Sequence, residues 1–296
     1  AALQGVTAVG SALCTRSGWF VTSSAIRIAQ PLVFVVIALV LQPNLAVAAL
    51  FGWVGSLLIA SVAFRRIRLD SRWSDTRETL RREWRYPVMT TPVALLDVVA
   101  LALPLLFIAA AYGESDAGNY AQVQRLIGAP LTLTGVAVAQ VYFKYAGDIT
   151  RARTALSPFM LRIIAFLGSL SLAVFVAVFL FGEPVMRFLI GDGWRTDRYF
   201  LLVSLVPVIC RMTAAPVSST FVLTGKLALG SSWQIAYFVV TLSVLSVATQ
   251  WLDFDQMLVA FLCSEIAMYL LYVVLVWWTA RRYERNRCAP ASGASA

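Results

Sequence analysis

The chain has 296 residues, of which 60% are apolar and only 13% are charged, and its mean hydropathy is +0.78. This composition excludes a soluble globular domain, because too few polar residues remain to cover its surface. The net charge of +9 does not indicate a nucleic acid partner, since the basic residues lie between apolar stretches, where membrane proteins carry them. The four cysteines are far apart and the sequence has no histidine, so we expect no metal site and no cofactor.

Long uncharged stretches recur along the chain, each near the roughly 20 residues that cross a bilayer as a helix. The first stretch, Ala1 to Cys14, is too short to cross; it predicts the end of a helix in a natural protein that begins further upstream. The pattern then predicts eight complete spans in an all-α, polytopic membrane bundle. These spans cover residues 21–41, 45–64, 87–112, 119–143, 158–181, 199–225, 233–251 and 257–279.

Charge alternates between successive connections and so predicts the orientation of the spans. Residues 65–85 hold eight arginines, and further basic residues follow near 144–153, at Lys226 and in 281–287. The intervening connections are neutral, mixed or acidic. We therefore expect a multi-pass protein of the bacterial inner membrane with a cytoplasmic C-terminus. Residues 74–85 alternate acids and bases and are either a charged linker or a short amphipathic helix on the inner surface.

Ionisable residues occur well inside four spans, at Asp97, Arg125, Arg211 and Glu265. Each costs about 2.5 to 3.5 kcal/mol on insertion scales, so each needs a partner or a watery cavity. Counted along the helices, Asp97 and Arg211 lie near the midplane, whereas Arg125 and Glu265 share a depth nearer the outer surface. Two opposite-sign pairs are therefore compatible with the spacing, and for Glu265 simple neutralisation is the favoured interpretation.

Small and polar residues accompany both arginines. Arg125 begins a stripe at helical spacing that includes Gly128, Thr132, Gly135 and Ala139, flanked by the polar side chains of Gln122, Gln124 and Gln140. Around Arg211 the same spacing gives Ser204, Pro207, Ala215 and Ser218. Such a face is too polar for lipid and lines either a tight helix contact or a cavity. For both arginines the pattern favours a functional role.

The segments YPVMTTPVALLDVVALALP and GNYAQVQRLIGAP resemble the oligosaccharide and polysaccharide flippase family of the superfamily that includes the multidrug and toxin extrusion transporters. Tyr120, Arg125 and Pro130 match the family's Y-x4-R-x4-P element, and Gln140 follows as a family-like polar residue. The later segments FGEPVMRFLIGDGW and APVSSTFVLTGK are also similar to that family. Asp97 is a departure, because the family favours a neutral asparagine there, and it strengthens the expectation of an Asp97 to Arg211 pair.

The resemblance implies two six-helix lobes. Residues 1–64 would then be the end of the N-lobe, 65–86 a cytoplasmic linker, 87–280 the C-lobe and 281–296 a cytoplasmic tail. It also implies that the protein flips undecaprenyl diphosphate-linked oligosaccharide to the outer leaflet by alternating access through a cationic cavity. The residues implied to bind the substrate are Arg125, Arg211, Gln124, Gln140 and Tyr120, with Asp97 and Glu265 as charge partners or ion-coupling groups.

Two alternatives remain at this stage. One is a drug or small-molecule antiporter of the same superfamily, because a fold does not fix its cargo. The other is a membrane enzyme such as a polysaccharide polymerase, although the longest outer connection expected, residues 182–198, is short for a catalytic loop. We expect no enzymatic activity; the expected partners are lipid-linked oligosaccharide, membrane lipids and other membrane proteins of polysaccharide assembly, and not nucleic acid.

Overall fold

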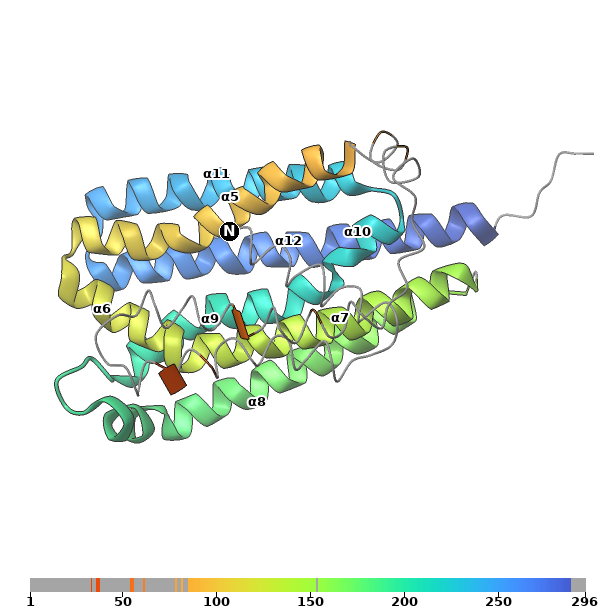
Figure 1. The fold of residues 1–296 in the computed structure, drawn as a ribbon. Coiled ribbons are helices and arrows are strands. Elements are labelled where there is room, and N and C mark those ends of the chain that lie inside the picture. Colours follow the sequence, from red (N-terminus) through yellow and green to blue (C-terminus); the bar gives the residue numbers. More distant parts are fainter. Residues whose placement is uncertain are drawn as a thin grey trace, which may run out of the picture. The chain divides into compact units, whose positions relative to one another are not determined.

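In a computed structural model of the protein, residues 85–152 and 154–288 are described, together with a few isolated positions before residue 85. The chain divides into two compact units, Ala1–Glu83 and Trp84–Ala296. All of the architecture below belongs to the second unit, whose described residues form helices and their connections without a strand (Figure 1). The predicted spans 21–41 and 45–64 and the predicted surface segment 74–85 lie outside the described residues, isolated positions aside.

Six helical stretches in the described part of the chain are long and apolar enough to cross a membrane. The prediction of eight complete spans is therefore not supported, because the described residues hold only the last six. These six stretches are α5 (Arg85–Ala111), then α6 (Glu114–Val123) with η1 (Gln124–Gly128) and α7 (Ala129–Arg151), then α8 (Ser157–Ile190), then α9 (Arg198–Ala214) with η2 (Ala215–Ser218) and α10 (Ser219–Leu223), then α11 (Leu227–Trp251), and finally α12 (Phe254–Cys288).

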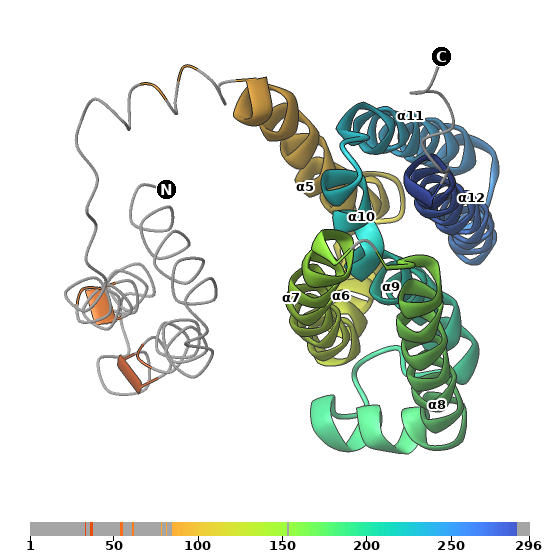
Figure 2. The same ribbon diagram turned by 90° about the vertical axis from the view of Figure 1, so that its right-hand side faces the viewer.

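Helix α8 extends beyond its predicted end at residue 181. It continues to Ile190, so the connection predicted over residues 182–198 is shortened to Gly191–Asp197. The added turns are amphipathic: Phe188 is exposed while Met186 is buried, which favours a helix at the edge of the bundle. Pro184 lies within these turns, and a proline inside a helix bends it. Figure 2 shows the C-terminal turns of α8 bending away from the axis of the rest of the helix.

Ionic contacts join the connections at one end of the bundle. The guanidinium of Arg195 donates to Asp255 at 2.8 Å and to Asp197 at 2.6 Å, and Asp197 caps α9 by accepting from the backbone N–H of Phe200. The hydrogen bond to Asp255 is the largest influence on Arg195 and raises its pKa. Burial alone raises the pKa of Asp197, but the hydrogen bonds from Arg195 and Phe200 together hold that pKa below its ordinary value.

At the opposite end, α12 fixes the start of α8. The carboxylate of Glu284 accepts from the backbone N–H of Ser157 at 2.6 Å and from its hydroxyl at 2.6 and 2.7 Å. A carboxylate at this position satisfies a backbone donor that the first turn of a helix leaves free and complements the helix dipole. Helix α12 continues to Cys288, so its last turns extend into the segment predicted as a tail.

The helix α9 lies in the middle of the unit and packs against α7, α8 and α12, while α11 packs against α5 and α12 (Figure 2). The packing of η1 and α7 on α9 is close because both present a glycine there. A Cβ at Gly135 would meet the Cγ of Met212 at 3.4 Å, and one at Gly128 would lie 3.5 Å from a methyl of Val208. This arrangement brings α5, η1, α9, α11 and α12 around one cavity.

Candidate functional site

A π-helical turn positions Arg125. Between α6 and α7 the residues Gln124–Gly128 form η1, in which the N–H of Ala129 bonds back to the carbonyl of Gln124, five residues earlier. Pro130 follows directly; it has no N–H to donate, and its ring crowds the carbonyl four residues before it. A wider π turn relieves this conflict without ending the helix, and such turns are frequent at functional sites.

Arg125 and Arg211 line the same cavity, which has a volume of about 310 Å³. Arg125 comes from η1 and Arg211 from the last turn of α9, so two separate helical stretches supply the guanidinium groups. The other polar groups of the lining are Tyr120, Gln124, Thr132, Tyr237 and Glu265. Arg125 is exposed and forms no ion pair or hydrogen bond with any described residue.

The predicted stripe that begins at Arg125 divides between two roles. Gly128 and Gly135 are buried and make the close contact with α9. Thr132 is exposed to the cavity and donates to the carbonyl of Gly128 at 2.9 Å. The stripe therefore serves both purposes expected of a polar helix face: its glycines make a tight contact with α9, and Thr132 forms part of the cavity wall.

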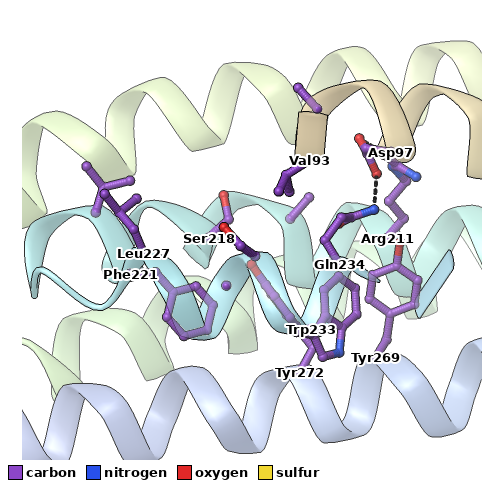
Figure 3. Close-up of a pocket in the computed structure, with 15 residues that line it drawn as sticks. Val93, Asp97, Arg211, Ser218, Phe221, Leu227, Trp233, Gln234, Tyr269 and Tyr272 are labelled. Atoms are coloured by element: carbon purple, nitrogen blue, oxygen red, sulfur yellow. Dashed lines mark hydrogen bonds and ion pairs between the residues drawn. The ribbon is translucent and has the colours of Figure 1, made fainter. Parts of the chain in front are cut away.

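The predicted pair of Asp97 and Arg211 is confirmed. The Nη2 of Arg211 donates to Asp97 at 2.7 Å, and the amide of Gln234 donates to the other carboxylate oxygen of Asp97 at 3.0 Å (Figure 3). Asp97 thus joins α5 to α9 and to α11. The Nη1 of Arg211 is buried and has no hydrogen-bond partner among the described residues. Arg211 therefore retains a donor for another group while it is paired.

The second charge pair compatible with the sequence, Arg125 with Glu265, is not formed. Both residues line the cavity, as their similar depth predicted, but no ion pair joins them. Glu265 is only 3% exposed, and one of its carboxylate oxygens has no hydrogen-bond partner among the described residues. Position along a helix fixes depth but not the direction of a side chain, and the π turn sets the direction of Arg125.

Of the other predicted site residues, Tyr120 and Gln124 line the cavity and Gln140 does not. Tyr120 is buried at 6% exposure and lines the cavity, and Gln124 lines it too while donating to the carbonyl of Ser204 at 3.2 Å. Gln140 is half-buried further along α7 and does not line this cavity. Tyr237 and Gln234 are site residues that the sequence did not single out. A polar residue inside an uncharged span was the available signal for Gln234.

A second cavity, of about 320 Å³, is lined by both members of the charge pair. Asp97, Arg211 and Gln234 line it together with an aromatic cluster of Phe221, Trp233, Tyr269 and Tyr272 (Figure 3). Arg211 lines both cavities, whereas Asp97 lines only the second.

These features define a multi-pass helical membrane protein whose bundle contains a polar cavity with two arginines. The family of polysaccharide biosynthesis proteins matches residues 1–197. Because this match covers more than half of the chain, the protein belongs to that family, as the resemblance in the sequence predicted. No curated protein and no solved structure matches the chain. The match includes Asp97 and Arg125 but ends before Arg211, whose role is therefore argued from geometry.

Proposed function

We propose that the protein flips undecaprenyl diphosphate-linked oligosaccharide from the cytoplasmic to the outer leaflet of the bacterial inner membrane. The observation that carries this proposal is the cavity shared by Arg125 and Arg211 inside an apolar bundle. A charge within a membrane bundle is costly unless it is paired, and Arg125 has no partner among the described residues. A diphosphate supplies that partner, because planar guanidinium groups bind phosphate oxygens through paired hydrogen bonds.

The proposed route keeps the lipid tail in the bilayer while the charged head group passes through the cavity. The family match to polysaccharide biosynthesis supports a lipid-linked sugar as cargo. An inside-negative potential of about 100 mV favours outward movement of each negative charge by about 2.3 kcal/mol. With basic connections in the cytoplasm and the C-terminus on the same side, this potential drives an anionic substrate in the direction that polysaccharide export needs.

The cavity also contains one feature that favours an organic-cation antiporter of the same superfamily. Glu265 is a buried carboxyl with Tyr120, Tyr237 and Phe261 in the same lining, and such a combination suits a cationic, aromatic ligand. The two arginines oppose this alternative, because they repel a cation. The described outer connections are short, the longest being Gly191–Asp197, which supports a transporter over a polymerase.

Replacement of Arg125 tests the proposal in cells that depend on this protein for surface polysaccharide. Arg125→Ala should abolish the polysaccharide while the amount of membrane-inserted protein stays unchanged, because an unpaired cavity cation contributes to binding more than to packing. Arg125→Lys should restore part of it, since lysine keeps the charge but loses the paired donors. The matched control is Arg162→Ala, which removes an exposed arginine of α8 outside the cavity.

A normal polysaccharide profile in the Arg125→Ala strain would refute the assignment of Arg125. Loss of the protein itself in that strain would show a structural role instead. A loss of polysaccharide in the Arg162→Ala strain, equal to that in Arg125→Ala, would show that any arginine in the unit is needed and would remove the support for a specific phosphate site.

A further inference from the structure

We propose that the second cavity, lined by Asp97, Gln234 and Trp233, binds the sugar that is attached directly to the diphosphate. This inference rests on the proposed function and adds a division of the substrate between two chambers. The diphosphate occupies the cavity of Arg125, and the adjoining sugar occupies the cavity beyond the Asp97–Arg211 pair. Three properties of the lining support this assignment: its mixture of polar groups and aromatic rings, its balanced charge, and the residue Arg211 that it shares with the first cavity.

The lining has a polar side and an aromatic side. Asp97 offers carboxylate acceptors, Gln234 offers an amide, and Ser218 and Ser231 add hydroxyl groups. The rings of Trp233, Tyr269 and Tyr272 line the same cavity (Figure 3). A pyranose matches both sides, because its hydroxyl groups need donors and acceptors when they are buried and its C–H face packs on aromatic rings. The volume of about 320 Å³ is at the lower end of the range for small-molecule sites.

The aromatic side is held rigidly. The Trp233 ring is centred 4.3 Å from that of Tyr272 and 5.8 Å from that of Tyr269, and its indole N–H donates to the carbonyl of Met268 at 3.3 Å. Rings that are fixed before a ligand arrives lose little freedom on binding it. On the polar side, the hydrogen bonds from Arg211 and Gln234 likewise fix the Asp97 carboxylate. The chamber is therefore preorganised on both sides.

The charge of the lining favours a neutral ligand. Asp97 and Arg211 are the only charged side chains among the lining residues, and they pair with each other at 2.7 Å. The first cavity differs, because it is lined by Arg125, which pairs with no described residue, as well as by Arg211 and Glu265. The Nη1 of Arg211 has no hydrogen-bond partner among the described residues and belongs to a side chain that lines both chambers. A substrate with a phosphate in one chamber and a sugar in the other would contact Arg211 from both sides.

A third cavity has a mostly apolar lining and serves as a comparison. It has a volume of about 350 Å³ between α8, α9 and α12. Most of its lining is apolar, and the hydroxyl groups of Ser171 and Thr213 bond to each other at 3.1 Å. A lipid chain suits that cavity, whereas in the chamber of Asp97 and Gln234 it would leave the carboxylate and amide without the additional partners that a sugar supplies.

Binding of two kinds of probe to the purified protein in nanodiscs tests the sugar site by calorimetry. The first probe is geranyl diphosphate, and the second is the same molecule carrying glucose, galactose or N-acetylglucosamine on its diphosphate. At least one sugar should lower the Kd about tenfold relative to the bare diphosphate, as one good additional hydrogen bond does. Gln234→Leu should remove this gain, so that the glycosylated and the bare probes bind the variant with equal Kd. The matched control Gln122→Leu, outside both chambers, should change neither value.

Two results would overturn the sugar site: no glycosylated probe binds more tightly than the bare diphosphate, or Gln234→Leu weakens both probes equally. Gln234→Met, which is close in size to glutamine, serves as the second variant where Gln234→Leu does not fold. Failure of the proposed function looks different. In that case geranyl diphosphate itself does not bind, or Arg125→Ala leaves its Kd unchanged, and the premise of the sugar site is lost as well.

Discussion

Replacing Asp97 by alanine removes the carboxylate that accepts from Arg211 at 2.7 Å and from Gln234 at 3.0 Å. Arg211, whose side chain is only 22% exposed, would then keep its charge without its partner. Breaking a fully buried pair costs about 3 to 5 kcal/mol, whereas an exposed pair contributes at most about 1 kcal/mol. Since the Asp97 side chain is 37% exposed, we expect a loss of about 2 kcal/mol in the free energy of unfolding.

Thermal unfolding of the detergent-solubilised protein measures this loss. For a chain of this size about 2 kcal/mol corresponds to a fall in Tm of about 4 °C. Asp97→Asn should lower Tm by about half as much, because asparagine still accepts a hydrogen bond but gives up the charge assistance. In a double-mutant cycle, Asp97→Ala combined with Arg211→Ala should cost less than the sum of the two single changes, by about 1 to 2 kcal/mol.

The reasoning fails if Asp97→Ala has the Tm of the unmodified protein, or if the two changes are additive. Additivity would mean that Asp97 and Arg211 contribute to stability through separate neighbours. A higher Tm for Asp97→Ala would mean that the cost of keeping this carboxylate in the bundle exceeds the stabilisation from its pair.

Three further predictions concern packing and the helix ends. Glu284→Ala should lower the free energy of unfolding by about 1 kcal/mol, the usual cost of losing a helix cap. Adding Ser157→Ala to this variant should lower the free energy of unfolding little further, because the partner of Ser157 is already gone. Chemical denaturation of the single and the double variant measures both values. Asp197→Asn should lower Tm at neutral pH. Folding lowers the pKa of Asp197, so its ionised carboxylate stabilises the folded protein at pH values above 3.8, the pKa of the unfolded state. The difference in Tm between the variant and the unmodified protein should therefore shrink as the pH falls below 3.8. Gly135→Ala should change Tm little, since its Cβ would meet Met212 at 3.4 Å, an ordinary van der Waals distance. Gly135→Leu should overpack the contact and lower the free energy of unfolding by about 1 to 3 kcal/mol. Equal Tm values for the two variants would contradict the close approach of α7 to α9.

Sequence reasoning predicted the Asp97–Arg211 pair because the physical constraint is simple. A lone charge in the membrane interior needs a partner, and counting residues along helices places both groups at one depth. The same counting placed Arg125 and Glu265 at one depth, and they do line one cavity, yet they do not pair. Depth follows from the sequence alone, but the direction of a side chain depends on how the helices rotate against each other.

The π turn at Gln124–Gly128 shows why the direction of Arg125 was not predictable. One extra residue in a helical turn shifts all later side chains by about 100° around the axis. Pro130 signals a local conflict, but the sequence does not say whether a kink, a break or a wider turn resolves it. Similarly, the predicted span ended at residue 181, whereas α8 continues through Pro184 to Ile190 as an amphipathic helical end.

The second chamber was missed for a different reason. Its aromatic residues, Trp233, Tyr269 and Tyr272, lie in apolar spans where rings usually pack in the core or at the membrane boundary. They line one cavity with Asp97 only because α11 and α12 bring them beside this residue of α5. No spacing in the sequence encodes a contact between residues so far apart along the chain.

Transport in proteoliposomes tests the central claim, that the cavity of Arg125 and Arg211 recognises the diphosphate of a lipid-linked oligosaccharide. The measurement follows fluorescent lipid-linked oligosaccharide as it becomes accessible to an impermeant glycosidase. The intact protein should move the diphosphate-linked substrate, and Arg125→Ala should slow it at least about tenfold, because a hydrogen bond to a charged group contributes about 1.5 to 3 kcal/mol. Equal rates for the intact protein and Arg125→Ala, or equal rates for the diphosphate-linked lipid and an uncharged glycolipid, would contradict the claim.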